Sequence, residues 1–145
     1  MPDLIREHTW GTEGLQRVLI EAAEWGTREH IASILRDEGY ETVSCPGPEG
    51  SGQRCTLASG HGCGVAEEVH VVVHALRSWD LRNVEALRAL RRRLPATPVV
   101  VETPAAEAAR RKDELAGCIV IESPYSAPDL VAAVAQALEG SAPAV

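Results

Sequence analysis

Five short, mostly apolar runs recur along this chain, and most are followed by a segment with helical spacing. The runs occupy residues 17–21, 40–45, 69–73, 98–101 and 118–121. Runs of this kind are typical of parallel strands that helices cover on both faces. Parallel neighbours also need long crossover connections, which are usually helical. The pattern therefore predicts an α/β fold: a three-layer, doubly wound, five-stranded parallel sheet with strand order 2-1-3-4-5.

The segments between the runs have the signals of amphipathic helices. In the first of them, Ile31, Ile34 and Leu35 form an apolar stripe, and Gly39 is placed to end the helix. An Ala-rich helix is expected over residues 105–116. After the third run, the residues expected on the buried face of a helix are Leu81, Val84, Leu87 and Leu90.

Residues 45–64 break this alternation. They contain six glycines and two prolines and show no helical period. Glycine and proline have the lowest helix propensities. We therefore expect a Gly/Pro/Cys-rich loop in place of much of the second helix.

Length and charge limit the possible roles. The 145 residues suffice for one domain, which we expect over residues 17–140, with an arm at 1–16 and a tail at 141–145. The net charge of −7 disfavours nucleic-acid binding. No apolar run approaches membrane-spanning length, and the first residues lack the apolar core of a secretory signal. The expected location is cytoplasmic, without membrane contact.

Four stretches follow one another in the order found in a signalling family. They read RVLIEAAEWGTREHIASILRDEGYE, VHVVVHALRSW, TPVVVETP and GCIVIESPY. Over about residues 17–139 the chain resembles a response-regulator receiver domain, with its CheY-like, flavodoxin-like fold. Some actinobacterial receiver-like proteins are similar in carrying cysteines in a loop before the third strand. The resemblance implies a role in signal transduction, as in two-component systems.

The same resemblance implies where a phosphate-accepting pocket would lie. In working receivers two acids after the first strand and an acceptor aspartate bind Mg²⁺, and a lysine and a hydroxyl contact the phosphate. Here the acids fall on Ala22 and Ala23, the acceptor on His74 and the lysine on Ser123, whereas Thr103 keeps the hydroxyl. Mg²⁺ prefers hard oxygen ligands. We therefore expect a degenerate pocket, that is, a pseudo-receiver that signals without phosphorylation.

Protein contact is the role that remains to such a domain. The resemblance places Tyr125 on the face through which receivers usually signal. Trp25 and Trp79 follow the first and third strands, so they should lie on one rim of the sheet. They could anchor a partner or a flat ligand, or they could fill the abandoned pocket. The expected partner is another protein or the second copy of a homodimer.

The cysteines offer an alternative function. Cys45, Cys55, His61 and Cys63 could hold zinc or an iron–sulfur cluster, or the thiols could act as a redox sensor with a Cys55–Cys63 disulfide. No pair has the C-x-x-C spacing of common metal sites, so unliganded thiols remain an alternative. Cys118 is expected in the core. Because so few apolar side chains occur in the loop, an ordered loop would imply a cross-link.

The third strand allows a prediction about burial. Val71 and Val73 should face one side, and His70, Val72 and His74 the other. Because helices should cover both faces, we expect His70 to be largely buried and hydrogen-bonded.

Enzyme signatures are missing from the sequence. It has no G-x-G-x-x-G after a strand, no P-loop and no nucleophile elbow. We therefore do not expect an enzyme.

Overall fold

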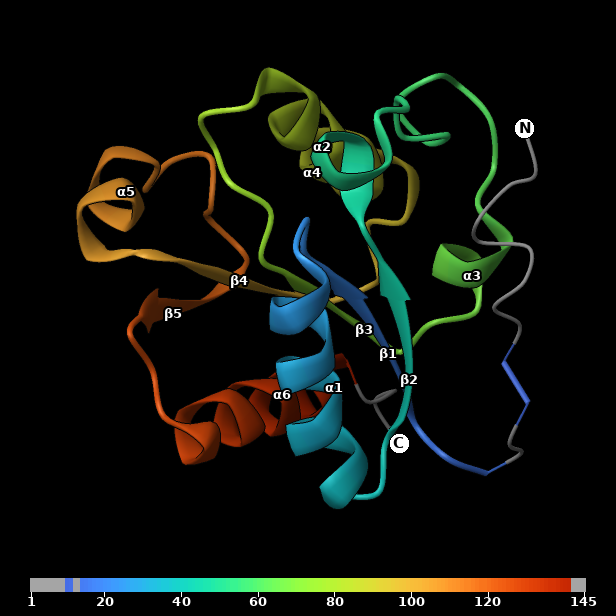
Figure 1. Ribbon diagram of the computed structural model, residues 1–145, viewed down its shortest axis with the longest axis vertical. Helices are drawn as coiled ribbons and strands as arrows, with labels where there is room; N and C mark the ends of the chain where they lie inside the picture. The colour runs from blue at the N-terminus through green and yellow to red at the C-terminus, as the bar shows by residue number, and fades with distance from the viewer. Residues whose placement is uncertain (1–9, 12–13, 142–145) are drawn as a thin grey trace.

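One parallel sheet organises the computed structural model, which describes residues 10–11 and 14–141 (Figure 1). Its strands lie in the order β2-β1-β3-β4-β5, as the sequence predicts. The strands are β1 (Arg17–Glu21), β2 (Glu41–Cys45), β3 (Val71–His74), β4 (Val99–Pro104) and β5 (Ile119–Ser123).

Helices lie on both faces of this sheet (Figure 1). The helices α1 and α6 cover one face, α2, α3 and α4 cover the other, and α5 contacts β4 and β5. Their bounds are α1 (Trp25–Asp37), α2 (Gly47–Ser51), α3 (Gly64–Glu67), α4 (Leu81–Arg93), α5 (Ala105–Arg110) and α6 (Ala127–Ser141). No helix in the described part of the chain is long and apolar enough to cross a membrane.

The core forms two layers because successive strand residues point to opposite faces. Val71 and Val73 pack with α1 and α6, whereas Val72 packs with α4 on the other side. All three are fully buried, which confirms the alternation predicted for the third strand.

The burial predicted for His70 is wrong. It is exposed, because β3 begins one residue later, at Val71. His70 therefore precedes the strand and lies outside the cover of the helices. The expected hydrogen bond is present: His70 Nδ1 accepts from the backbone N–H of Arg17 at 2.9 Å.

Several helix ends follow their sequence signals. Gly39, two residues after the end of α1, adopts a φ of +93°, a conformation that residues other than glycine rarely adopt. Ser126 and Asp129 exchange two backbone-to-side-chain hydrogen bonds of 3.2 Å at the start of α6. The helix expected over 105–116 is shorter, because α5 ends at Arg110 and turns follow it.

Parts of the predicted arm and tail, residues 1–9, 12–13 and 142–145, lie outside the described residues. Trp10, within the arm, contacts the domain. Its indole N–H donates to the Val65 carbonyl at 3.1 Å, and the guanidinium of Arg17 lies 5.7 Å from its ring centre.

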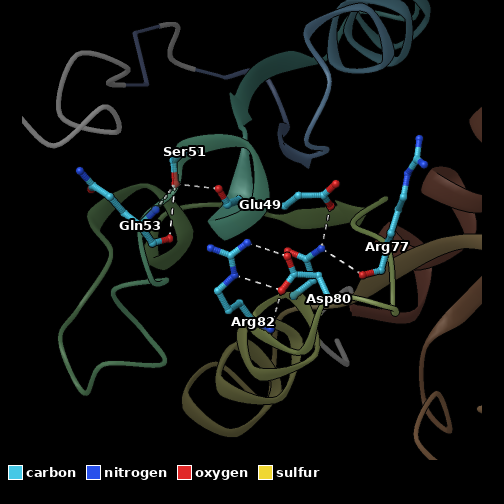
Figure 2. A network of polar contacts seen from close by, with 8 residues as sticks. Glu49, Ser51, Gln53, Arg77, Asp80 and Arg82 are labelled. Carbon is cyan, nitrogen blue, oxygen red and sulfur yellow. Dashed lines mark hydrogen bonds and ion pairs between the residues drawn. The ribbon is translucent and has the colours of Figure 1, made fainter.

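A polar network joins α2 to the start of α4 (Figure 2). The amide of buried Asn83 donates to the Glu49 carboxylate at 3.2 Å and to the Arg77 carbonyl at 3.0 Å. Asp80 caps α4 by accepting from the N–H of Arg82 at 3.0 Å. The side chain of Arg77 extends away from this network. The contacts therefore position the segment between β3 and α4, which borders the candidate site.

Candidate functional site

A hollow of about 400 Å³ lies at the carboxyl ends of the strands. In doubly wound sheets ligands bind at this end. Ala22 and Ala23, which follow β1, line one part of the hollow. Ala75, Arg77 and Trp79, which follow β3, line another. At the ends of β1 and β3 the lining therefore carries the methyl groups of three alanines, Ala22, Ala23 and Ala75.

The backbone at the end of β1 is already engaged. The guanidinium of Arg28, on α1, donates to the carbonyls of Ala22 and Ala23 at 2.9 Å each. These carbonyl oxygens thus have a cationic partner from within the chain.

The neighbouring strands β4 and β5 add further polar groups to the lining. They are Glu102 and Thr103 of β4 and Ser123 of β5. Thr103 is buried, and the hydroxyl of Ser123 donates to the half-buried Glu102 carboxylate. Burial raises the pKa of Glu102 above its usual value, and the Ser123 hydrogen bond and the charge of Arg77 oppose this shift.

Two further carboxylates line the hollow, and both have partners. Glu24 pairs with Arg77 at 3.0 Å. Glu107 accepts from the Ser78 hydroxyl at 2.8 Å and pairs with Arg110. Within the described residues, Glu102 has no such ion pair.

His74 does not line the hollow. It is 1% exposed, and its Nδ1 lies 2.9 Å from the Glu21 carboxylate, which is itself buried. Both side chains lie on the α4 face of the sheet, because Glu21 and His74 are partners in the β1–β3 register. The residue that lines the hollow at the end of β3 is Ala75. Of the positions that the resemblance gave for the pocket, His74 therefore lies outside the hollow, and the next residue, Ala75, lines it.

The donor set of the hollow does not fit Mg²⁺. Over residues 10–11 and 14–141, no group of three or more His, Cys, Asp or Glu side chains is arranged to hold a metal ion. Magnesium needs near-octahedral oxygen ligands, often supplied by carboxylates. The alanines at the ends of β1 and β3 supply none.

Solved structures show which fold this is. CheY4 of Vibrio cholerae matches 86% of this chain and 100% of its own, with 18% identity and a TM-score of 0.65. A receiver domain protein from Clostridium thermocellum matches 87% of this chain and 96% of its own, with 21% identity and a TM-score of 0.65. The chain has the receiver fold. The receiver domain of NtrX from Brucella abortus adds a match over 84% and 98%, with 24% identity and a TM-score of 0.63.

Sequence comparison adds nothing to this likeness: no protein-family model and no curated protein matches the chain.

Four of the five pocket positions inferred from the resemblance to receivers meet in the hollow. They are Ala22, Ala23, Thr103 and Ser123. Sequence reasoning missed Glu102 and Arg77 as lining residues. The signal for Glu102 was a carboxylate directly after the apolar run 98–101, at the end where a receiver-fold site lies.

The two indoles do not fill the hollow. Trp79 lines it but is 68% exposed, and Trp25, the first residue of α1, is 70% exposed. Leu81, predicted on the buried face of its helix, is instead 75% exposed because it begins α4. Tyr125 is half-buried against the α1–α6 core, and burial raises its pKa to about 12. Of these exposed apolar side chains, Trp79 lines the hollow, and Trp25 and Leu81 lie within two residues of lining residues.

The cysteine segment packs against the sheet. Cys45, Cys55 and Cys63 line a cavity of about 80 Å³ together with Glu21. Cys63 and Leu57 are buried in the α4-side core. The cysteines are free thiols. The loop thus has buried contacts of its own, and the expectation that a cross-link orders it stays a prediction to be tested.

The metal and redox alternatives find no support in these thiols. His61 is exposed and does not line the cavity that holds the cysteines. Burial raises the pKa of Cys45 to about 12, and it also raises the pKa of Cys55 and Cys63. The thiolate is the form that reacts and binds metals. Cys118 is half-buried against the same core, and burial raises its pKa as well.

Proposed function

We propose that this receiver-fold domain is a protein-interaction module in signal transduction that does not accept a phosphoryl group. The observation that carries the proposal is the row of Ala22, Ala23 and Ala75 along the hollow. Phosphoryl transfer depends on metal ions or cations that neutralise the charge of the transferring group. Without carboxylates at these positions, Mg²⁺ has no ligands there, and the group has no acceptor.

No nearby residue replaces the missing acceptor. His74 is buried on the other face and contacts Glu21, so acetyl phosphate cannot reach its ring. Glu24 and Glu107 are engaged with arginines. Glu102, on the neighbouring strand β4, accepts a hydrogen bond from Ser123.

The surface beside the hollow favours a protein partner. Trp25, Trp79 and Leu81 are all exposed there, and aromatic side chains are enriched where binding energy concentrates in interfaces. The net charge of −7 disfavours a nucleic-acid partner. The free thiols agree with action in the reducing cytoplasm.

Phosphorylation can be tested by intact-protein mass spectrometry after incubation with Mg²⁺ and acetyl phosphate. The wild-type chain should gain no phosphoryl group. A variant carrying Ala22→Asp, Ala23→Asp, Ala75→Asp and Ser123→Lys restores the carboxylates and the cation, and it should gain one. Stable phosphorylation of the wild type, lost in His74→Ala, would contradict the proposal.

A further inference from the structure

We propose that the hollow binds an arginine side chain of the protein partner, between the carboxylate of Glu102 and the indole of Trp79. This inference rests on the proposed function and specifies the chemistry of the partner. Three observations carry it: an unpaired carboxylate, an exposed ring on the same hollow and the exposed apolar groups on its rim.

Glu102 supplies the charge. Its carboxylate is half-buried, and its hydrogen bond comes from the neutral hydroxyl of Ser123. Partial removal from water disfavours an ionised carboxylate, and the charge of Arg77, which pairs with Glu24, offsets this only in part. An incoming cation would supply an opposite charge, and the interaction is stronger in a recess than on an open surface.

The cations around the hollow are engaged elsewhere. Arg77 pairs with Glu24, Arg110 pairs with Glu107, and Arg28 donates to the carbonyls after β1. Of the carboxylates that line the hollow, Glu102 is therefore the one left for a cation from outside.

Trp79 supplies the second contact. Its ring lines the same hollow, and most of its surface is open to solvent. An indole face attracts cations. A guanidinium is planar, so it can stack on the ring while two of its N–H groups donate to one carboxylate. An ammonium group cannot do both in this way. The site should therefore prefer arginine to lysine.

The rim indicates a protein segment as the source of the arginine. Leu81 lies two residues beyond Trp79, and Trp25 follows Glu24, which lines the hollow. These apolar side chains lie outside the lining of the hollow. A free cation bound in the hollow would leave Leu81 and Trp25 exposed to water. If the arginine belongs to a polypeptide, the residues beside it can pack on these two side chains.

The probe is acetyl-Gly-Arg-Gly-amide, added to the ¹⁵N-labelled wild-type chain without Mg²⁺ or acetyl phosphate and followed by NMR. The expected dissociation constant is on the order of millimolar, as for a weak single-side-chain contact. Shifts should concentrate at the Trp79 indole N–H and at the amides of Glu102, Thr103 and Ser123. The lysine analogue should bind several-fold more weakly, and the glutamate analogue should not bind.

Two variants and two matched controls locate the site. Glu102→Gln should weaken binding at least tenfold, and Trp79→Leu should weaken it several-fold. Glu139→Gln, an exposed acid on α6, and Leu15→Ala, an exposed apolar side chain outside the lining, should leave it unchanged. Each variant must keep the dispersed spectrum of the folded chain.

The inference is overturned if the arginine peptide causes no saturable shift, if Glu102→Gln binds it as well as the wild type, or if the shifts lie away from the hollow. This outcome is separable from that of the proposed function. Phosphorylation of the wild type would contradict the proposed function but would not change the result of the arginine titration. A failed titration would contradict the arginine site but would not change the phosphorylation result.

Discussion

Adjacent residues at the ends of β1 and β3 belong to two very different regions. Glu21 and His74 point to the α4 face, where they contact each other and are buried beneath the cysteine segment. Ala22 and Ala75, the next residues along, line the open hollow. On one face the strand ends support a packed core, and on the other they leave space. At the end of each strand, a residue that packs in the core is thus followed directly by a residue that lines the hollow.

The packed region depends on thiols acting as small apolar groups. Cys63 and Leu57 are buried with Val65 and Ala66, and Cys55 packs against the same cluster. Free cysteine is among the most often buried residue types. The segment is therefore held by the contacts that hold the rest of the core.

The largest effect should come from a charge beneath the packed region. Val72→Asp places a carboxylate without a partner at a fully buried position of β3. The cost is several kcal/mol against a total stability of about 5–15 kcal/mol, so soluble folded protein should be lost. Val120→Asp is the matched control, because Val120 of β5 is 36% exposed. Normal folding of the Val72→Asp variant, judged by yield and circular dichroism, would overturn the assignment of β3 to the core.

The next largest difference in stability is expected between substitutions at His74 and at Ala75. His74→Ala leaves the buried Glu21 carboxylate without its partner and should lower the free energy of unfolding by about 3 kcal/mol. Ala75→Ser, one residue away beside the hollow, should change it by less than about 0.5 kcal/mol. Urea denaturation measures both. Equal costs for the two variants would abolish the contrast between the regions.

The cysteine segment tests whether packing alone orders it. Leu57→Ala should lower the free energy of unfolding by about 2 kcal/mol, since the side chain is buried against the α4-side core. Hydrogen exchange of residues 52–63 should remain slow in the presence of reductant and chelator, and in Cys55→Ser. Loss of protection with either reagent would show that a disulfide or a metal holds the segment.

The smallest effect concerns alkaline pH. The Cys45 thiol has the ordinary cysteine pKa of 9.0 when unfolded, and burial raises its pKa to about 12 in the folded chain. As the pH rises above 9 the unfolded chain loses this proton first, so the contribution of Cys45 is complete below that pH and is lost towards 12. At about pH 10 the loss is on the order of 1 kcal/mol.

Cys45→Ala should remove this contribution, so its stability should fall less between neutral pH and about pH 10 than that of the wild type. Urea midpoints across this range measure the difference. Cys118→Ala is the control, because Cys118 is less buried. The same pH dependence in Cys45→Ala and wild type would mean that the thiol is accessible to water in the folded state.

The fold was predictable because its signals are local. The apolar runs predicted all five strands, and β1 matches its predicted bounds, Arg17–Glu21. The resemblance placed Ala22 and Ala23 directly after the first strand, and both line the hollow.

Two features were not predictable from the sequence. The run around β3 is apolar on both faces, so its pattern does not tell which residue ends the strand, and a shift by one residue moves His74 to the wrong face. Burial of Cys63 and Leu57 depends on contacts with residues distant in sequence, such as Val43 and Leu90. The loop composition alone suggested too little apolar surface.

The most direct test of the central claim is a Mg²⁺ titration followed by the fluorescence of Trp79, whose ring borders the hollow, with Trp79→Phe used to subtract the other indoles. The wild type should show no saturable change, and the variant carrying Ala22→Asp, Ala23→Asp and Ala75→Asp should show one. Saturable Mg²⁺ binding by the wild type, with NMR shifts at the residues lining the hollow, would mean that the hollow holds the ion without these carboxylates.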